Sequence, residues 1–204
     1  MAYGFDEGFF GLLVFLFIGL VALAAGLNAR RLYLRRLAVW REFALMRGLQ
    51  FIEASVNSPA RIMGVREGKS VEIAVRSSGR GKNRRIFTEF KVEISGVIPS
   101  DLWMRREGGL SRVEKFFGAK DIRTGFEDLD RIAMVRGERA DAIVEYFSDE
   151  RVRRAAVDFL TLSPLNRVES GSVILRLPHV VGDQESLQEC LEKALVAARG
   201  LSVR

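Results

Sequence analysis

The side chains best suited to chemistry are the cations of one short, glycine-rich loop. Gly79 and Gly81 are interleaved there with Arg80, Lys82, Arg84 and Arg85. Such loops can bind phosphate, but a P-loop needs glycine five positions before its Gly-Lys pair and Ser or Thr after it. Arg76 and Asn83 occupy those two positions. The sequence therefore excludes a P-loop and leaves two interpretations, a solvated hairpin tip or a contact with anionic lipid or polymer.

A second candidate is a group of acidic residues, because carboxylates bind hard cations and act as general acids and bases. The group consists of Asp121, Glu127, Asp128 and Asp130. Gly125 and Leu129 do not fit the spacing of a calcium-binding EF-hand loop. Two alternatives remain. One is a solvated turn, and the other is an enzyme that uses Asp121, Asp128 or Asp130, two of which would then have to face one cleft.

The remaining reactive side chains are one histidine, His179, and one cysteine, Cys190. A single cysteine excludes an internal disulfide and a cysteine-based zinc cluster, and a single histidine excludes the histidine pairs of most catalytic metal sites. The sequence has no serine nucleophile elbow, dinucleotide fingerprint or kinase motif set. We therefore predict a non-enzymatic protein without a metal or cofactor.

The N-terminal part of the chain is dominated by an apolar run over residues 9–27, which contains no charged side chain. As a helix it would be about 28 Å long, close to the hydrocarbon thickness of a bilayer, and it predicts one transmembrane span. The flanks predict its orientation. Residues 1–8 carry Asp6 and Glu7 but no Lys or Arg, whereas residues 28–50 carry six arginines and one glutamate. The positive-inside rule then places residues 1–8 outside and the rest in the cytoplasm, at the cell inner membrane.

A cleaved signal peptide is the alternative, because Ala22-Leu23-Ala24 has the small-x-small pattern of a cleavage site. The acidic N-terminal flank and the arginines after the apolar run argue against it, since signal peptides begin with a basic region.

The segment after the span, residues 28–50, is predicted to be a basic juxtamembrane helix. Its arginines Arg30, Arg31, Arg35 and Arg36 could contact anionic headgroups. Tyr33 and Trp40 share one helical face and are the candidate membrane-interface residues, because aromatic residues are enriched there. The same face can instead pack on the domain, and a connecting helix docked on the domain is the favoured interpretation of this segment. A lipid sensor and an oligomer-forming stem are the alternatives.

Charge distribution argues against nucleic acid as the partner. The formal net charge is +6, of which residues 1–27 contribute −2 and residues 28–50 contribute +5, which leaves +3 for residues 51–204. The basicity therefore belongs mostly to the segment next to the membrane, where each basic residue gains about 1 kcal/mol from anionic lipid. Nucleic-acid binding by the domain is thus an unlikely function.

Residues 51–204 predict one cytosolic α+β domain with a mostly antiparallel sheet and helices on one face. Period-two alternation predicts strands over 69–76 and 86–95, joined by the basic loop, and further strands at 60–65, 102–106, 131–136 and 166–177. Helix patterns and caps predict helices over 112–117 and 138–147. They also predict a helix capped by Ser148 and a last helix that begins after its cap Asp183 and stops at Gly200.

The stretch over residues 118–160 resembles a pattern found in uncharacterised bacterial single-span membrane proteins. The matching residues are Asp121, Ile122, Asp130, Val135 and Gly137, with Gly64 and Gly68 upstream. Leu129 and Phe126 depart from the pattern. The resemblance covers about half of the domain and implies a membrane-tethered cytosolic α+β module without a known activity.

Together these features predict a membrane-anchored accessory or scaffold protein. Its partners would be the lipid bilayer and a membrane protein or a second copy of the chain. The alternatives are an anionic lipid or nucleic-acid binding module that uses the basic loop, and the enzyme that uses the acidic group.

Overall fold

The computed structural model describes the backbone of residues 7–55, 58–107 and 121–202, and the side chains from residue 13 onward within these ranges. Its helices are α1 (Glu7–Met46), the 3-10 helix η1 (Gly81–Asn83), α3 (Glu127–Asp130), α4 (Ala140–Tyr146), α5 (Glu150–Leu162) and α6 (Gln184–Gly200). Its strands are β1 (Gln50–Ile52), β2 (Arg61–Arg66), β3 (Lys69–Ser78), β4 (Arg85–Glu93), β5 (Trp103–Arg106), β6 (Ala133–Arg136), β7 (Arg167–Glu169) and β8 (Ser172–Leu177).

The strands form one eight-stranded sheet in the order β1-β2-β3-β4-β8-β7-β5-β6. Each neighbouring pair is antiparallel, so the predicted α+β class is confirmed. Two tight turns hold parts of the sheet in register. Glu67 and Gly68 join β2 to β3, and Ser170 and Gly171 join β7 to β8, all with positive φ. Positive φ at both turn residues is the type I′ geometry that suits two-residue hairpins.

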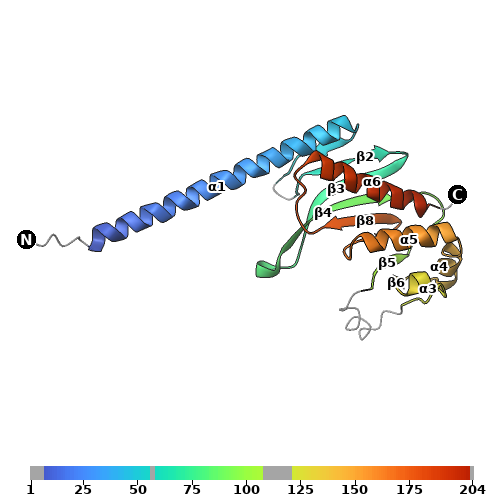
Figure 1. Ribbon diagram of the computed structural model, residues 1–204. Coiled ribbons are helices and arrows are strands. Elements are labelled where there is room, and N and C mark those ends of the chain that lie inside the picture. The colour runs from blue at the N-terminus through green and yellow to red at the C-terminus, as the bar shows by residue number, and fades with distance from the viewer. Residues whose placement is uncertain (1–6, 56–57, 108–120, 203–204) are drawn as a thin grey trace, which may run out of the picture.

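Helices α5 and α6 pack on the sheet, α6 against β4 and β8 and α5 against β5 (Figure 1). The core between them is dominated by fully buried aromatic rings, including Phe90 of β4, Phe147, and Phe159 of α5. Local signals fix where the two helices begin. Asp149 accepts a hydrogen bond from the Arg151 amide (2.8 Å), and Asp183 accepts one from the Ser186 amide (2.7 Å). Both are N-caps, which satisfy amides that a helix leaves unpaired in its first turn.

Helix α1 extends away from the domain (Figure 1). Among the described residues it is the one helix long and apolar enough to span a membrane, and none of its most apolar part is buried. Its last turns differ, because Phe43 and Ala44 lie fully inside the core. The domain therefore begins about ten residues before the predicted boundary at residue 51.

Several other predictions need correction. The strand predicted over 166–177 is the hairpin β7–β8, because Ser170 and Gly171 form a turn. The N-cap of α5 is Asp149 rather than Ser148. Gly200 is the last residue of α6 rather than the residue that follows its end. Strand β1 and helix α3 were not predicted. The helix predicted over 112–117 lies outside the described residues.

Candidate functional site

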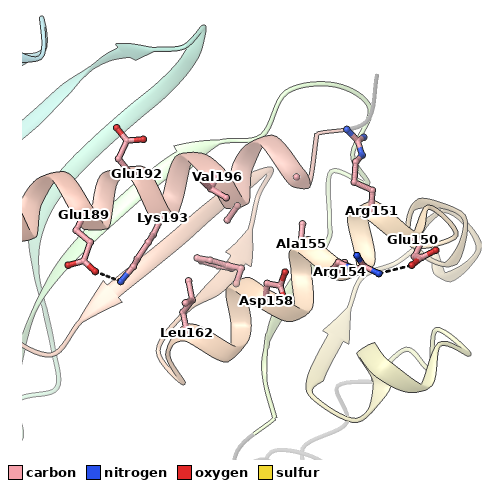
Figure 2. A pocket seen from close by; sticks show the side chains of 13 residues that line it. Glu150, Arg151, Arg154, Ala155, Asp158, Leu162, Glu189, Glu192, Lys193 and Val196 are labelled. Carbon is pink, nitrogen blue, oxygen red and sulfur yellow. Dashed lines mark hydrogen bonds and ion pairs between the residues drawn. The ribbon is translucent and has the colours of Figure 1, made fainter.

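A large hollow lies between α5 and α6, with a volume of about 920 Å³. Figure 2 shows side chains of both helices converging on it. Its floor is apolar. Phe159 is buried there, whereas Leu162 and Val196 are 55% and 57% exposed. We call this surface the α5–α6 groove.

The groove is narrow at one end, where α5 and α6 nearly touch. A Cβ atom added to Gly200 would lie 2.5 Å from the Cβ of Ala155, so only glycine allows this approach. The Arg151 side chain also donates to the carbonyl of Ser202 at this end (2.9 Å). The two helices run antiparallel, and the opposite, wide end lies between Leu162 and Lys193.

The rim of the groove is charged, and its two ends differ in sign. Ion pairs join Glu150 to Arg154 (3.0 Å) and Glu189 to Lys193 (2.6 Å), and the second raises the pKa of the Lys193 amine through the hydrogen bond from that amine. Asp158 and Glu192 form no ion pair among the described residues, and Glu192 accepts only the amide of Gln188 (2.6 Å).

Counted by formal charge, the narrow end is basic and the wide end is acidic. The narrow end holds two arginines and one glutamate, for a net charge of +1. The wide end holds Asp158, Glu189, Glu192 and Lys193, for a net charge of −2. An apolar floor with a charged rim of this kind has the chemistry of a groove that takes an amphipathic segment.

The basic loop predicted from the sequence is the tip of the β3–β4 hairpin. Residues 76–86 are all exposed. The four cations of the tip, Arg80, Lys82, Arg84 and Arg85, form no ion pair or side-chain hydrogen bond with another described residue. On α1, Arg30, Arg31, Arg35 and Arg36 are exposed as well. The structure thus leaves both sets of cations open to a ligand.

The two aromatic residues predicted at the membrane interface have different environments. Tyr33 is 48% exposed, as an interface residue would be. Trp40 is 2% exposed, and its indole Nε1 donates to the carbonyl of Val181 (2.9 Å). Trp40 therefore docks α1 on the domain, as the docked-helix interpretation expects, and does not lie at a membrane interface. Along the helical face that the two residues share, Tyr33 lies outside the domain and Trp40, two turns later, lies inside its core.

The acidic group is used in local structure. Asp130 accepts hydrogen bonds from the amide and hydroxyl of Thr124 (both 2.9 Å) and holds the turn before α3. Asp121 pairs with Arg136 (3.0 Å), and Asp128 lies 4.0 Å from Arg153. Among the described residues, no three His, Cys, Asp or Glu side chains come together as a metal site would require. The enzyme alternative gains no support from this arrangement.

The structure also shows where the one histidine and the one cysteine lie. His179 contributes its backbone carbonyl to the Thr88 hydroxyl (2.7 Å), and Cys190 faces the core, where burial raises the pKa of its thiol. The groove itself was missed in the sequence analysis. The available signal was Leu162 and Val196, apolar residues outside the core faces of their helices.

Comparison with protein-family models, curated proteins and solved structures finds no match to this chain.

Proposed function

We propose that this protein is a membrane-anchored, non-enzymatic accessory or scaffold protein whose cytoplasmic domain binds an amphipathic helix of a partner membrane protein. The observation that carries the proposal is the α5–α6 groove, with its exposed apolar floor and its acidic wide end. Helix α1 supplies the anchor, and the domain supplies the docking surface.

The anchor rests on the length, composition and exposure of α1. Its apolar side chains from Leu13 to Leu27 are exposed, including Phe15 at 81% and Phe17 at 67%. Such a surface is unfavourable in water, at about 25 cal/mol per Å², and is favourable in hydrocarbon. The helix also continues without a break to Met46, and the buried Trp40, Phe43 and Ala44 in its last turns dock it in the domain. This continuity favours a retained anchor over a signal peptide that is removed.

The orientation of the groove supports a partner in the same membrane. Just before α6, Val181 accepts the hydrogen bond from Trp40 of α1, and Gly182 lies against the side chain of Arg36. From there α6 runs away from the free end of α1 (Figure 1). The acidic wide end of the groove therefore faces the anchor side, and the basic narrow end lies farther away.

This polarity matches what membrane proteins present on the cytoplasmic side. Their segments next to the membrane are enriched in Lys and Arg. A partner helix that leaves the membrane would bring its basic end to Asp158 and Glu192, while its apolar face covers Leu162 and Val196. A second copy of this chain fits less well, because in one membrane both copies would turn their acidic ends the same way.

The test uses the full chain in lipid nanodiscs and a fluorescently labelled probe peptide. The probe is a designed amphipathic helix with leucines at i, i+3, i+4 and i+7 and lysines at one end, and a second probe carries glutamates in place of the lysines. We expect fluorescence anisotropy to show tighter binding of the lysine probe. Val196→Asp should weaken binding at least tenfold, which is about 1.4 kcal/mol.

The control is Val65→Asp on β2, because Val65 is also exposed (66%) and lies away from the groove. It should change binding less than twofold. Asp158→Arg combined with Glu192→Arg should reverse the preference between the two probes. No measurable binding, or equal losses with Val196→Asp and Val65→Asp, would refute the groove as the binding site. Self-association of the peptide-free chain that Val196→Asp abolishes would show instead that a second copy occupies it.

A further inference from the structure

The β3–β4 hairpin tip is a defined basic turn rather than a loose loop. Gly79 has φ +87°, and a Cβ there would lie 2.4 Å from the carbonyl oxygen of Asn83, so the tight crossing requires glycine. Backbone hydrogen bonds from Asn83 to Arg80 and from Arg84 to Gly81 (both 3.2 Å) close the turn. The tip therefore presents its cations on a fixed backbone.

Hydrogen bonds tie the base of this hairpin to α1. The Thr88 hydroxyl of β4 accepts from the Val181 amide (2.9 Å), and the Val181 carbonyl accepts from the Trp40 indole of α1 (2.9 Å). All three residues are buried, with exposed fractions of 2% or less. Thr88 and Trp40 both bond to Val181, so this point serves as a common origin from which the reach of the hairpin and of the helix can be compared.

From this origin the hairpin and the free part of α1 extend toward the same side of the domain (Figure 1). Trp40 is thirteen residues from Leu27, where the apolar run ends, which corresponds to about 20 Å of helix. Thr88 is three residues from Arg85, or about 10 Å of strand. The turn of η1 adds about 6 Å. The tip therefore extends about 16 Å toward the end of the apolar run, and long Arg and Lys side chains cover the remaining few ångströms.

We propose that the hairpin tip binds the phosphate groups of anionic lipids in the membrane that holds α1, and so forms a second membrane contact of the domain. This inference rests on the proposed anchor. Guanidinium groups of Arg80, Arg84 and Arg85 can bind phosphate oxygens in pairs, and Lys82 adds a point charge. Ile86, 45% exposed on the same hairpin, lies next to this basic turn and can meet the apolar edge of the interface. On α1, Arg30 and Arg31 lie about 15 and 14 Å of helix from Trp40, close to the distance that the tip covers.

The experiment places a fluorophore at the tip of the full chain in nanodiscs. Asn83→Cys is labelled with an environment-sensitive dye in a Cys190→Ala background, since Cys190 is the single native cysteine. We compare nanodiscs of phosphatidylcholine with nanodiscs that contain one third phosphatidylglycerol. The proposal predicts a blue shift and at least a twofold rise of emission with the anionic lipid, reversed by 0.5 M salt because screening shortens electrostatic range.

Replacing the four tip cations by glutamine should abolish the response. The matched control replaces Arg106, Arg123, Arg131 and Arg139 by glutamine, which removes the same charge from exposed sites on the other side of the domain, and it should retain the response. No response to anionic lipid, an equal loss in the control, or the same emission change from single-stranded RNA without anionic lipid would overturn the proposal.

The failure of this proposal and the failure of the anchor give different results. If the hairpin does not bind lipid, the chain still purifies inside the nanodisc and the dye shows no lipid dependence. If α1 is not an anchor, the chain is not retained in the nanodisc at all, and both proposals fall together.

Discussion

Glu89 is a largely buried charge on the side of β4 opposite the core residue Phe90. Its side chain is 10% exposed and contacts three arginines. Its Oε2 accepts from Nε of Arg176 (3.0 Å) and lies 3.5 Å from Nη2 of Arg167, and Nε of Arg76 lies 3.9 Å from Oε1. We predict that Glu89→Gln destabilises the domain, because glutamine keeps the shape of the side chain and removes its charge.

The magnitude follows from burial. Breaking a buried ion pair costs about 3–5 kcal/mol, because the remaining charge loses its partner. Here the side chains of Arg167 and Arg176 are 20% and 22% exposed, so water screens part of that cost. We therefore expect the free energy of unfolding to fall by about 2–3 kcal/mol. With a urea m-value of about 2 kcal/mol/M, the midpoint would fall by about 1–1.5 M.

The assay is urea denaturation of the full chain in mild detergent, followed by tryptophan fluorescence. Urea is required because guanidinium salt would screen the charges under test. Glu93→Gln is the control, since Glu93 lies four positions along β4 from Glu89, on the same sheet face, and is exposed. It should change the free energy of unfolding by less than about 0.5 kcal/mol. Equal effects of the two substitutions would refute the view that the arginine contacts stabilise the sheet.

Two further predictions concern the elements that hold the proposed surfaces in place. Trp40→Phe removes the buried hydrogen bond to Val181 and should cost about 1–2 kcal/mol of unfolding free energy in the same urea assay, whereas Tyr33→Phe at an exposed site should cost less than about 0.5 kcal/mol. Asp183→Ala removes the N-cap of α6 and should cost about 1 kcal/mol at pH 7. The hydrogen bond from the Ser186 amide lowers the pKa of the Asp183 carboxyl, so its contribution is present above the unfolded pKa of about 3.9 and is lost as the pH falls through the lower folded value. The unfolding free energies of Asp183→Ala and the parent chain should therefore converge as the pH falls through the folded pKa of Asp183, and a constant difference across pH would contradict the capping role.

The sequence predicted those elements whose signals are local. Period-two alternation found β3 and β4, because each strand buries one side, as Val71 and Ile73 of β3 show. Asp183 correctly predicted the start of α6, because an N-cap acts within the first turn of its helix. The Ser170-Gly171 turn was missed since a serine with positive φ is uncommon, and without that turn β7 and β8 read as one strand.

Features that depend on distant parts of the chain could not be predicted in this way. The position of β8 between β4 and β7 is set by pairing across about eighty residues, which no local pattern encodes. Trp40 occupies a helical face that suits either lipid or protein, and only its contact with Val181 decides between them. The groove arises from the Ala155–Gly200 approach of two helices that are far apart in sequence.

If both proposals hold, the hairpin and the groove affect each other through the geometry of α1. A domain held by one helix can rotate about it, and a second contact at the hairpin tip would stop that rotation and fix the height of the groove. Trp40 lies about 20 Å beyond the end of the apolar run, and the groove begins farther on, since α6 starts beside Trp40 and runs away from the anchor. The proposed partner helix must therefore continue for at least about 13 residues beyond the membrane before it reaches Asp158 and Glu192 at the wide end of the groove. This distance selects among partners, because a protein whose helix ends at the membrane surface cannot reach the groove, whatever the charge of its last turn.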